Sequence, residues 1–555
     1  MNRARFIATL GPASLFYEKM ERMAELGVAS FRINTAHVDK KYIGQAKKVL
    51  DEINERRKNE ITSSLLVDLK GPEIRMSTPD SKEVKISQGN IYEITDYGNT
   101  HLSINQKGIL ENLSSGDTIL VNDGRVKFSL ISNSDGILKV KSATDGSIRN
   151  NSRVNIPGKV LNLGSLTERD REFIVEGIKN DVEYFALSFV QESKNVEELR
   201  NTIMDYNGDQ FIISKIETSS GLKNIEGIIK SSDMIMIARG DLGVELPLKE
   251  IAIIQKELIR KAHAYGVPSI VATQILESMV SNETPTRAEV SDITNAIIDN
   301  ADILMLSEET AIGKYPVEAV EYLNDVVKFV ESNIRDFQEP EEFLGNRIAF
   351  SLAKSAKIIS RDIDSNILVM TRSGNTVKML SSLRPTGKIF AVTPNLKLEK
   401  KLSLFNNVYP IHLEEYSGKY EDIIERVKKT EIFKKGETIV VTSGEGYFTF
   451  GGTNDIRVEI IGDFMGRGYS IGESVSGKVT TDPNNMGDIL IIDECKDMDT
   501  EMEYKGVIFT CNPNNTVVNS ILKHSRCVVK QASFREKIMD GDEIHIDART
   551  GIIFK

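Results

Sequence analysis

Four charged side chains that follow short apolar segments are the residues best suited to chemistry in this 555-residue chain. Glu217 and Asp241 are carboxylates, the hard oxygen ligands that bind Mg²⁺ or Mn²⁺. Arg32 and Lys215 are cations that could offset negative charge developing on oxygen during phosphoryl transfer or enolate formation. In the structural alternative, the two carboxylates form ion pairs with Lys215 and Arg239 at the rim of a barrel. Spacing alone leaves both interpretations open.

Two loops have the composition of anion-binding turns. The sequence GDLG at residues 240–243 follows an apolar segment, so its backbone N–H groups could converge on a carboxylate or a phosphate. The sequence TRSGNT at residues 371–376 joins a predicted strand to a predicted helix and could hold a phosphate. Ordinary turn chemistry explains the first loop equally well, and helix capping explains the second.

The elements that must position these residues follow a regular pattern. Short apolar, β-branched segments alternate with segments of helical spacing over most of residues 1–336, which indicates βα units on a parallel sheet. Helices are expected at residues 247–265 and 287–299, among others. The predicted strands are residues 6–10, 29–33, 65–68, 184–188, 211–216, 234–238, 269–273 and 303–306. Eight such units predict a (β/α)8 TIM barrel, whose active site lies at the carboxyl ends of the strands.

The rest of the chain predicts three further domains. Residues 77–155 interrupt the barrel, formed by 1–76 and 156–336, with short strands at 83–86, 91–94, 118–121, 126–131 and 137–140, typical of an inserted β lid domain. Residues 337–467 resume the alternation, with a helix at 347–360 and strands at 367–370, 389–392 and 438–441, and predict a three-layer α/β domain. Residues 468–555, with strands at 489–492 and 506–510, predict a small appended β/α domain.

Composition excludes several classes of protein. A net charge of −11 and a pI near 5.4 argue against a nucleic-acid-binding protein. The sequence has no apolar run of about 18 residues, so no membrane span is expected. The three cysteines, Cys495, Cys511 and Cys527, are odd in number and lack C-x-x-C spacing, which argues against a disulfide framework or a structural zinc site. We therefore expect a cytoplasmic protein.

Longer motifs around these residues resemble one family. TLGPAS at 9–14, KGPEIR at 70–75, KIE at 215–217, ARGDLG at 238–243, ATQILESM at 272–279 and PTRAEVSD at 285–292 resemble pyruvate kinase over about residues 1–465. The resemblance implies transfer of a phosphoryl group from phosphoenolpyruvate to ADP in glycolysis, with Mg²⁺ or Mn²⁺ and K⁺ as cofactors. It also implies the same arrangement of barrel, lid and α/β domain, and a cytoplasmic homotetramer.

The resemblance implies roles for individual residues. Glu217 and Asp241 correspond to the divalent-metal ligands, and Lys215 to the lysine that stabilises the transition state. Arg32 corresponds to the arginine that binds the substrate phosphate, and Thr273 to the threonine near the substrate carboxylate and the proton-donating side. The other implied contacts are Gly240 and Asp241 for the substrate; Arg75, His37 and Lys159 for the nucleotide; Asn34, Asp68 and Leu69 for potassium; and Thr371, Ser373, Gly374, Asn375 and Thr376 for a phosphorylated effector.

Several positions depart from the family pattern. Ala36 replaces a serine that resembles a potassium ligand, and Val38 replaces a glycine. Glu308 adds a carboxylate near the end of the eighth predicted strand, either as a solvated rim charge or as a group that crowds the mouth. Lys159 matches the lysine that follows the lid only with a one-residue shift, and Gln191 stands where an arginine is common.

Charge balance gives a separate argument for potassium. In the resembled family, a glutamate in the GPE segment accompanies dependence on a monovalent cation, and this chain has Glu73. Asp68 and Glu73 near a phosphorylated substrate would repel it and each other unless a cation lay between them. Because Ala36 removes one oxygen ligand, the expected affinity for K⁺ is weak.

The last domain resembles the phosphohistidine-type mobile domain appended to some bacterial pyruvate kinases. Its corresponding segment, CNPNNT at 511–516, lacks a histidine, which favours a structural or interaction role. For the whole chain, an active pyruvate kinase is the leading hypothesis. One alternative is a regulatory paralogue that binds phosphoenolpyruvate but transfers phosphate poorly because of Ala36, Val38 and Glu308. Another is a barrel enzyme that acts on oxo-acids through a metal enolate.

Overall fold

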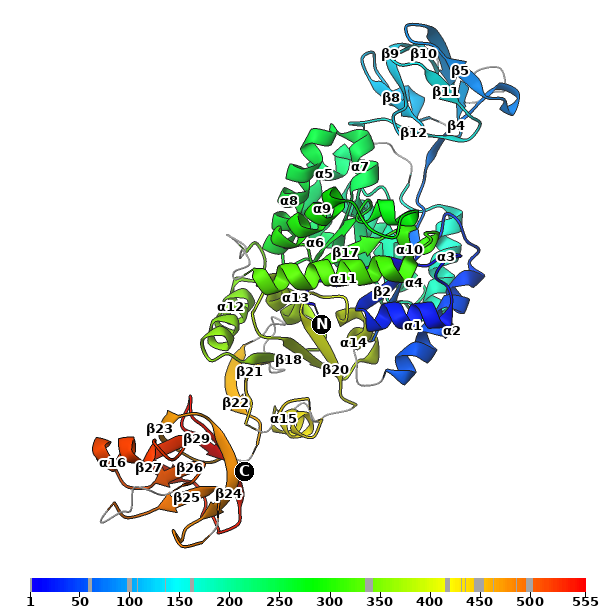
Figure 1. Cartoon of the computed structure of the whole chain (residues 1–555). Coiled ribbons are helices and arrows are strands. Elements are labelled where there is room, and N and C mark those ends of the chain that lie inside the picture. Colours follow the sequence, from blue (N-terminus) through cyan, green and yellow to red (C-terminus); the bar gives the residue numbers. More distant parts are fainter. Residues whose placement is uncertain are drawn as a thin grey trace. The chain divides into compact units, whose positions relative to one another are not determined.

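The computed structural model falls into two compact units (Figure 1). The first includes Met1–Lys354 and Val369–His412, and the second includes Ser355–Leu368, Leu413–Ser443 and Asp455–Lys555. The structure describes residues 2–57, 62–96, 102–106, 108–134, 136–159, 164–334, 343–414, 420–430, 432–434, 436–443, 454–462, 464–485, 487–495 and 503–555.

A closed barrel of eight parallel strands forms the centre of the first unit and confirms the predicted TIM barrel. The strands are almost entirely buried, because helices cover the outside of the sheet and side chains fill its inside. Each predicted strand is present, with both ends within one residue of the expected position. In order around the barrel they are β1 (Arg5–Thr9), β2 (Val28–Asn34), β3 (Ser64–Leu69), β13 (Tyr184–Leu187), β14 (Phe211–Ile216), β15 (Met234–Ala238), β16 (Ser269–Ala272) and β17 (Ile303–Leu306).

Amphipathic helices connect the barrel strands. Thr167 and Thr286 begin two of them with capping boxes, in which the threonine hydroxyl and an acidic side chain satisfy free backbone N–H groups. In the described part of the chain, no helix is both long enough and apolar enough to cross a membrane. The helices are α1 (Tyr17–Glu25), α2 (Lys41–Arg56), α3 (Glu168–Lys179), α4 (Ser193–Asp205), α5 (Ser219–Lys223), α6 (Ile225–Ser231), α7 (Arg239–Glu245), α8 (Leu248–Ala264), α9 (Arg287–Ile298), α10 (Glu308–Ala311) and α11 (Pro316–Asn333).

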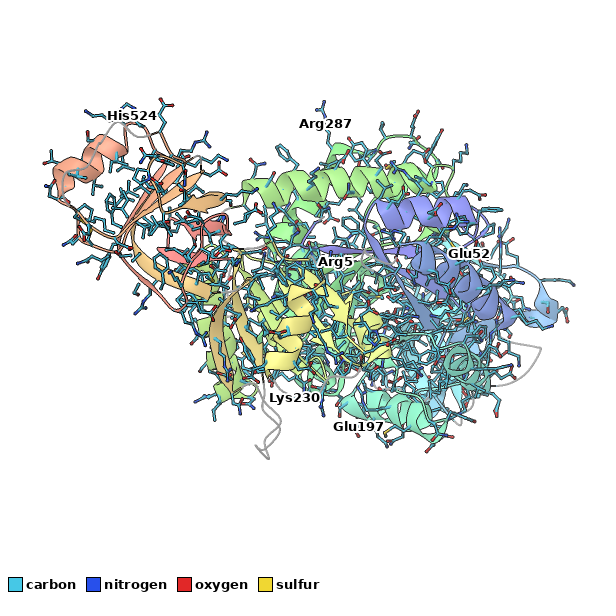
Figure 2. All side chains as sticks on the ribbon, turned by 90° about the horizontal axis from the view of Figure 1, so that it is seen from below. Arg5, Glu52, Glu197, Lys230, Arg287 and His524 are labelled. Carbon is cyan, nitrogen blue, oxygen red and sulfur yellow. A yellow bond between two sulfur atoms is a disulfide. The ribbon has the colours of Figure 1, made fainter. Side chains whose placement is uncertain are left out.

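Arg5, at the start of β1, is buried and connects the barrel to β20 (Val408–His412) and to the turn before it. Its guanidinium donates to the carbonyl oxygens of Phe405 at 3.2 Å and Val408 at 2.5 Å. Figure 2 shows Arg5 inside the molecule, whereas Glu52 of α2 and Glu197 of α4 lie at the surface. A buried arginine is stable here because carbonyl oxygens replace the water that it loses.

The lid is a second closed barrel within the first unit, with the order β10-β6-β7-β4-β12-β8-β9. Buried and exposed residues alternate along β9 and β10, as expected for strands with one face toward a core. The first strand begins at Ile74, so the lid barrel includes residues before the predicted boundary at 77. The lid strands are β4 (Ile74–Ser77), β5 (Val84–Ile86), β6 (Ile91–Thr95), β7 (Leu102–Ile104), β8 (Thr118–Val121), β9 (Val126–Ser134), β10 (Ile137–Ser142), β11 (Gly146–Ile148) and β12 (Ser152–Asn155).

The C-terminal α/β domain has a five-stranded sheet with the order β20-β19-β18-β21-β22. The sequence predicted β18, β19 and β21 but not the two edge strands, which are less completely buried. The predicted boundary between residues 336 and 337 lies outside the described residues. The elements are β18 (Asn366–Met370), β19 (Ile389–Thr393), β20, β21 (Thr438–Ser443) and β22 (Asp455–Ile460), with α12 (Arg347–Asp362), α13 (Asn375–Ser382), α14 (Leu396–Leu402) and α15 (Tyr420–Lys428).

The last part of the chain, here called the tail barrel (residues 464–555), is a third closed barrel. Its first strand runs from Phe464 to Gly472, so the domain boundary predicted at 468 falls inside a strand. The order is β23-β27-β26-β25-β24-β28-β29. The elements are β23 (Phe464–Gly472), β24 (Val475–Thr480), β25 (Ile489–Ile492), β26 (Gly506–Phe509), α16 (Asn515–Ile521), β27 (Cys527–Phe534), β28 (Glu543–Asp547) and β29 (Ile552–Phe554).

The expectation that the chain has no disulfide is wrong. Cys495 and Cys511 form a disulfide with their Cα atoms 6.0 Å apart. Strands β25 and β26 pair in parallel, with Ile492 opposite Phe509, and this register brings the two cysteines that follow them together. The odd number of cysteines required only one free thiol, which is Cys527, where burial raises the pKa to about 11.

Candidate active site

The predicted cations and carboxylates meet at the carboxyl ends of β2, β3 and β14. Strand register places Asn34 opposite Asp68. Nε of Arg32 donates to Oδ2 of Asp68 at 2.8 Å. Nζ of Lys215 lies 3.2 Å from Oδ1 of Asp68 and 3.0 Å from Oε1 of Glu217. Arg32, Asp68, Lys215 and Glu217 therefore form one cluster, here called the barrel cluster.

Charges in the barrel cluster change the protonation of their neighbours. Burial raises the pKa of Glu217 to about 7, while Lys215 lowers it and Asp241 raises it. Burial alone would lower the pKa of Lys215, but Asp68 and Glu217 raise it above its usual value. Burial would raise the pKa of Asp68, but Lys215 and Arg32 hold it below its usual value. The cluster thus holds fixed positive charges beside a carboxyl group that titrates near neutral pH.

Asp241 has a partner that the sequence did not suggest. Nη1 of Arg153, in strand β12 of the lid, donates to Oδ1 of Asp241 at 2.5 Å. The expected partner, Arg239, instead pairs with Asp292 at 2.6 Å and donates to the Thr273 carbonyl oxygen at 2.6 Å. Of the two ion pairs in the structural alternative, the one between Arg239 and Asp241 does not form, because both have other partners, whereas the one between Lys215 and Glu217 is present.

Gly240 and Thr273 contact each other where β15 and β16 end. The N–H of Gly240 donates to Oγ1 of Thr273 at 2.9 Å. Thr273 and Gln274 have φ angles of 69° and 55°, in a region that residues other than glycine rarely adopt. Arg239 donates to the carbonyl oxygens of both residues, which holds this turn in place. The backbone N–H predicted to bind substrate is thus occupied by the threonine hydroxyl.

Two of the three predicted nucleotide contacts are engaged in ion pairs. Nη2 of Arg75 lies 2.5 Å from Oε2 of Glu73. Nζ of Lys159 lies 2.8 Å from Oδ2 of Asp117, on the lid. The third residue, His37, lies in the loop after β2 and is exposed. The ion pairs of Arg75 and Lys159 therefore involve carboxylates outside the barrel cluster.

The charge-balance argument for potassium is wrong, because Asp68 and Glu73 both have cationic partners. Asp68 contacts two cations of the barrel cluster. Oε2 of Glu73 lies 2.9 Å from Nζ of Lys70 and also contacts Arg75. Burial would raise the pKa of Glu73, but hydrogen bonds from Arg75 and Lys70 lower it below its usual value. The potassium site therefore remains a prediction that rests on the family resemblance.

The other predicted potassium ligands lie on neighbouring strands. Oδ1 of Asn34 accepts a hydrogen bond from the N–H of Ala36 at 3.1 Å. The carbonyl oxygen of Leu69 accepts one from the hydroxyl of Ser188 at 2.8 Å. Each of these oxygens has a second lone pair that could face a cation.

The two predicted ligands of a divalent ion fit a hard cation that also binds other oxygens. Oε1 of Glu217 is buried and lies 3.0 Å from Nζ of Lys215, whereas Oε2 accepts from the N–H of Phe189 at 2.8 Å. Asp241 supplies the second carboxylate. Among the described residues, no group of three or more His, Cys, Asp or Glu side chains could hold a metal. Two carboxylates suit Mg²⁺, which keeps several waters and also binds substrate phosphates.

Glu308, the extra carboxylate of the eighth strand, is exposed, in agreement with a solvated rim charge. Its neighbour Glu309 is buried and accepts from the N–H groups of Ser307 at 2.6 Å and Leu276 at 3.0 Å. The buried carboxylate therefore fixes two loops at the mouth of the barrel, while the additional one faces water.

The predicted effector loop has features of a helix start. Thr371 is buried, and its hydroxyl accepts from the N–H of Gly374 at 2.8 Å. Gly374 has a φ of 81°, which suits glycine, and Asn375 begins α13. Ser373 and Thr376 lie on either side of this start. The geometry is compatible with capping and leaves the effector an expectation.

Sequence reasoning missed two residues of the site. Ser188 accepts a hydrogen bond from Nζ of Lys215 at 2.8 Å, and its position at the end of a predicted strand could have indicated this. Arg153 lies in the lid, far in sequence from Asp241, and no spacing pattern links the two.

Comparisons with known proteins agree with this geometry. Residues 1–320 match the family description "Pyruvate kinase, barrel domain", and residues 348–459 match "Pyruvate kinase, alpha/beta domain". The chain is 46% identical over 554 residues to a pyruvate kinase of Thermoplasma acidophilum, which covers 99% of this chain and 98% of that protein. It is 40% identical to a pyruvate kinase of Thermotoga maritima, over 82% of this chain and 99% of that protein.

Solved structures give the same result. A pyruvate kinase from Cryptosporidium parvum matches with a TM-score of 0.74 and 28% identity, over 83% of this chain and 96% of that chain. A pyruvate kinase from Pyrobaculum aerophilum matches with a TM-score of 0.74 and 26% identity, over 83% of this chain and 100% of that chain.

Proposed function

Since the chain belongs to the pyruvate kinase family and is a phosphotransferase, we propose how its own residues transfer a phosphoryl group from phosphoenolpyruvate to ADP. The observation that best supports this proposal is the barrel cluster, in which Arg32 and Lys215 lie beside Asp68 and Glu217 at the carboxyl ends of the strands. In this reaction the phosphorus–oxygen bond of phosphoenolpyruvate breaks, an oxygen of ADP bonds to phosphorus, and the remaining enolate takes a proton on carbon.

Arg32 and Lys215 bind and stabilise the phosphoryl group. Asp68 and the hydroxyl of Thr9 hold Arg32 in place, at 2.8 Å and 3.0 Å, so its charge is fixed before substrate arrives. Lys215 stabilises the oxygen that becomes negative as the phosphorus–oxygen bond breaks. Preorganised charges of this kind lower the barrier because they need no rearrangement during the reaction.

Glu217 and Asp241 hold Mg²⁺ or Mn²⁺. The carboxylate of Glu217 supports this role, because its buried Oε1 contacts Lys215 at 3.0 Å and keeps a further lone pair for an ion. When bound, the ion offsets negative charge on the phosphoryl and enolate oxygens. Glu217 must lose its proton to serve as a ligand, and its raised pKa makes this step sensitive to pH near neutrality.

Thr273 orients the substrate and lies on the side from which the enolate carbon takes its proton. Its Oγ1 accepts a hydrogen bond from the N–H of Gly240, so the hydroxyl hydrogen remains available to donate toward the substrate. Gly240 orients this hydroxyl through its N–H, and we expect the backbone of Asp241 to face the substrate carboxylate.

The remaining assignments rest on the family resemblance. We expect His37 to bind the nucleotide together with Arg75 and Lys159, once the ion pairs of these two residues rearrange. We also expect Asn34, Asp68 and Leu69 to bind K⁺. A phosphorylated effector at the loop of Thr371, Ser373, Gly374, Asn375 and Thr376, a homotetramer and a cytoplasmic location are further proposals of this kind. The tail barrel is proposed to be a phosphohistidine-type domain that has lost its histidine and acts in structure or interaction.

A coupled assay tests the function directly. The full chain is incubated with phosphoenolpyruvate, ADP, Mg²⁺ and K⁺, and pyruvate is measured through oxidation of NADH by lactate dehydrogenase. Pyruvate formation that requires ADP supports the proposal. Tight binding of phosphoenolpyruvate without pyruvate formation would support the regulatory alternative instead.

A further inference from the structure

Arg153 connects the lid to a carboxylate of the proposed metal site. It lies in β12, and its Nη1 donates to Oδ1 of Asp241 at 2.5 Å. Its guanidinium carbon lies 5.1 Å from the centre of the Phe189 ring. The two charged side chains are 20% and 27% exposed, so water screens their attraction only in part. The lid therefore contributes a cation at the position where a divalent ion is expected.

The guanidinium of Arg153 is incompletely satisfied in this position. Its Nη2 is buried and has no hydrogen-bond partner in the part of the chain that the structure describes. A buried donor without an acceptor is unfavourable, and a guanidinium binds best to groups that offer two or more oxygens. Arg153 is thus held by Asp241, yet it retains a donor for another acidic group.

A divalent ion and Arg153 compete for the same carboxylate. An ion bound by Glu217 and Asp241 would lie close to the guanidinium, and the two positive charges would repel each other. Lys215 is held by Asp68, Glu217 and Ser188 and can stay in place. Among the described carboxylates, only Asp241 lies within ion-pair distance of Arg153. Arg153 is therefore the cation that metal binding displaces.

A small pocket of about 40 Å³ beside Arg153 is lined by Arg153, Lys159, Glu73 and Glu245. Both carboxylates already have partners, since Glu73 pairs with Lys70 and Arg75, and Glu245 accepts hydrogen bonds from the N–H and the hydroxyl of Ser219. A phosphate that entered the pocket would therefore be a new acceptor for the displaced guanidinium. Two cations facing one pocket suit the phosphate oxygens of a nucleoside diphosphate. A phosphate there would satisfy the donor that Asp241 leaves free.

We propose that Arg153 holds Asp241 in the metal-free protein, yields this carboxylate to the divalent ion, and then binds a phosphate oxygen of ADP. The inference rests on the proposed function, because it names the nucleotide of that reaction. It gives the lid a part in the reaction, since metal binding frees the whole guanidinium of Arg153 for the nucleotide, whereas without the metal Asp241 holds Nη1 and, in the described structure, the buried Nη2 is unpartnered.

Direct binding measurements on the full chain test this proposal. Free Mn²⁺ is measured by electron paramagnetic resonance during a titration without substrates, and binding of labelled ADP is measured by equilibrium dialysis at saturating Mn²⁺. Arg153→Ala should bind Mn²⁺ about tenfold more tightly and ADP about tenfold more weakly, the size of one charge-assisted hydrogen bond. Arg153→Lys, which keeps the charge but loses the planar fork, should fall between the wild type and Arg153→Ala in both measurements.

A matched control comes from the same domain. Arg149 is a lid arginine with an 83% exposed side chain, 3.6 Å from Glu83, and Arg149→Ala should leave both affinities unchanged. Thermal melting verifies that each variant folds. If Arg153→Ala does not fold, the affinities of Arg153→Lys alone are compared with those of the wild type.

Two outcomes would overturn the proposal. Unchanged or weaker Mn²⁺ binding by the Arg153 variants would disprove competition for Asp241. Tighter Mn²⁺ binding with unchanged ADP binding would disprove the contact with phosphate. Neither measurement needs turnover, so a chain that forms no pyruvate would refute the proposed function without deciding the role of Arg153.

Discussion

Nζ of Lys215 lies 3.0 Å from Oε1 of Glu217, yet the pKa of this carboxyl is raised to about 7. Burial is the largest cause of the rise, and the nearby Asp241 adds to it, so one lysine does not compensate for the loss of water. A divalent ion would supply the missing positive charge. The pair therefore indicates that the metal-free site holds Glu217 partly protonated at neutral pH.

Metal binding should depend on pH for this reason. At pH 6, below the raised pKa of Glu217, most of the carboxyl is protonated and the metal must displace a proton; at pH 8 it need not. We therefore expect the affinity for Mn²⁺ without substrates to fall by about tenfold from pH 8 to pH 6. Well below the pKa of Glu217, where each ion displaces one proton, the affinity would fall by about tenfold for each further pH unit. Calorimetric titrations at both pH values measure this, and equal affinities would contradict the pKa.

Asp302 and Arg384 form a buried ion pair at 3.0 Å within the first unit. Burial would raise the pKa of Asp302, but Arg384 and His263 lower it to about 2. A carboxyl with a lowered pKa in the folded protein stabilises the fold at high pH and loses this contribution as pH falls. We expect a loss of about 2 kcal/mol in the free energy of unfolding between pH 4 and pH 2, measured by urea unfolding.

The variant Asp302→Asn should be destabilised by about 3–5 kcal/mol at pH 7, because it leaves Arg384 buried without its carboxylate. Asp364→Asn is the matched control, since Asp364 is fully accessible and lies 3.9 Å from Arg549. Similar stabilities of the two variants would show that the buried pair contributes little.

Potassium should activate the enzyme with a weak half-saturation. Ala36 lacks a side-chain oxygen beside Asn34, so water or a carbonyl oxygen must complete the ligand shell. Ala36→Ser should lower the K⁺ concentration at half-activation, measured at constant ionic strength with tetramethylammonium as the replacement ion. Full activity of the wild type in tetramethylammonium alone would mean that Lys70, Arg75 and the barrel cluster already supply the needed charge.

The tail barrel should not carry phosphate. Its segment at 511–516 has no histidine, and His545 is partly occupied, with Nδ1 2.5 Å from the hydroxyl of Ser476 and its ring against Phe554. His524 follows α16 and is exposed (Figure 2). Incubation with labelled phosphoenolpyruvate and alkaline work-up should recover no phosphohistidine from residues 464–555. Stable label on His524 or His545 would show that the domain is a phosphate carrier.

The barrel was predictable because its strands are buried on both faces. Segments such as Phe211–Ile216 and Met234–Ala238 are nearly continuous apolar runs, and their ends fix where Lys215 and Asp241 lie. Short lid strands such as Leu102–Ile104 carry too few residues to show a period. The edge strands of the C-terminal sheet were missed because they are partly exposed and therefore lack a continuous apolar run.

Contacts between distant segments were not predictable. The pair of Arg153 with Asp241 joins residues 88 positions apart, and no local pattern encodes it. The same holds for the disulfide of Cys495 with Cys511, which depends on the parallel register of two strands that precede the cysteines. The number and spacing of the cysteines alone therefore could not predict the disulfide.

Lys215 is proposed to act mainly in the transition state of phosphoryl transfer, and the variant Lys215→Met tests this role most directly. We expect Mn²⁺ and phosphoenolpyruvate to bind within about threefold of the wild type at pH 8, where Glu217 is ionised without help, while single-turnover pyruvate formation falls by at least about 10³-fold. If binding and rate fell by equal factors, Lys215 would serve ground-state binding, which would contradict its proposed role in the transition state.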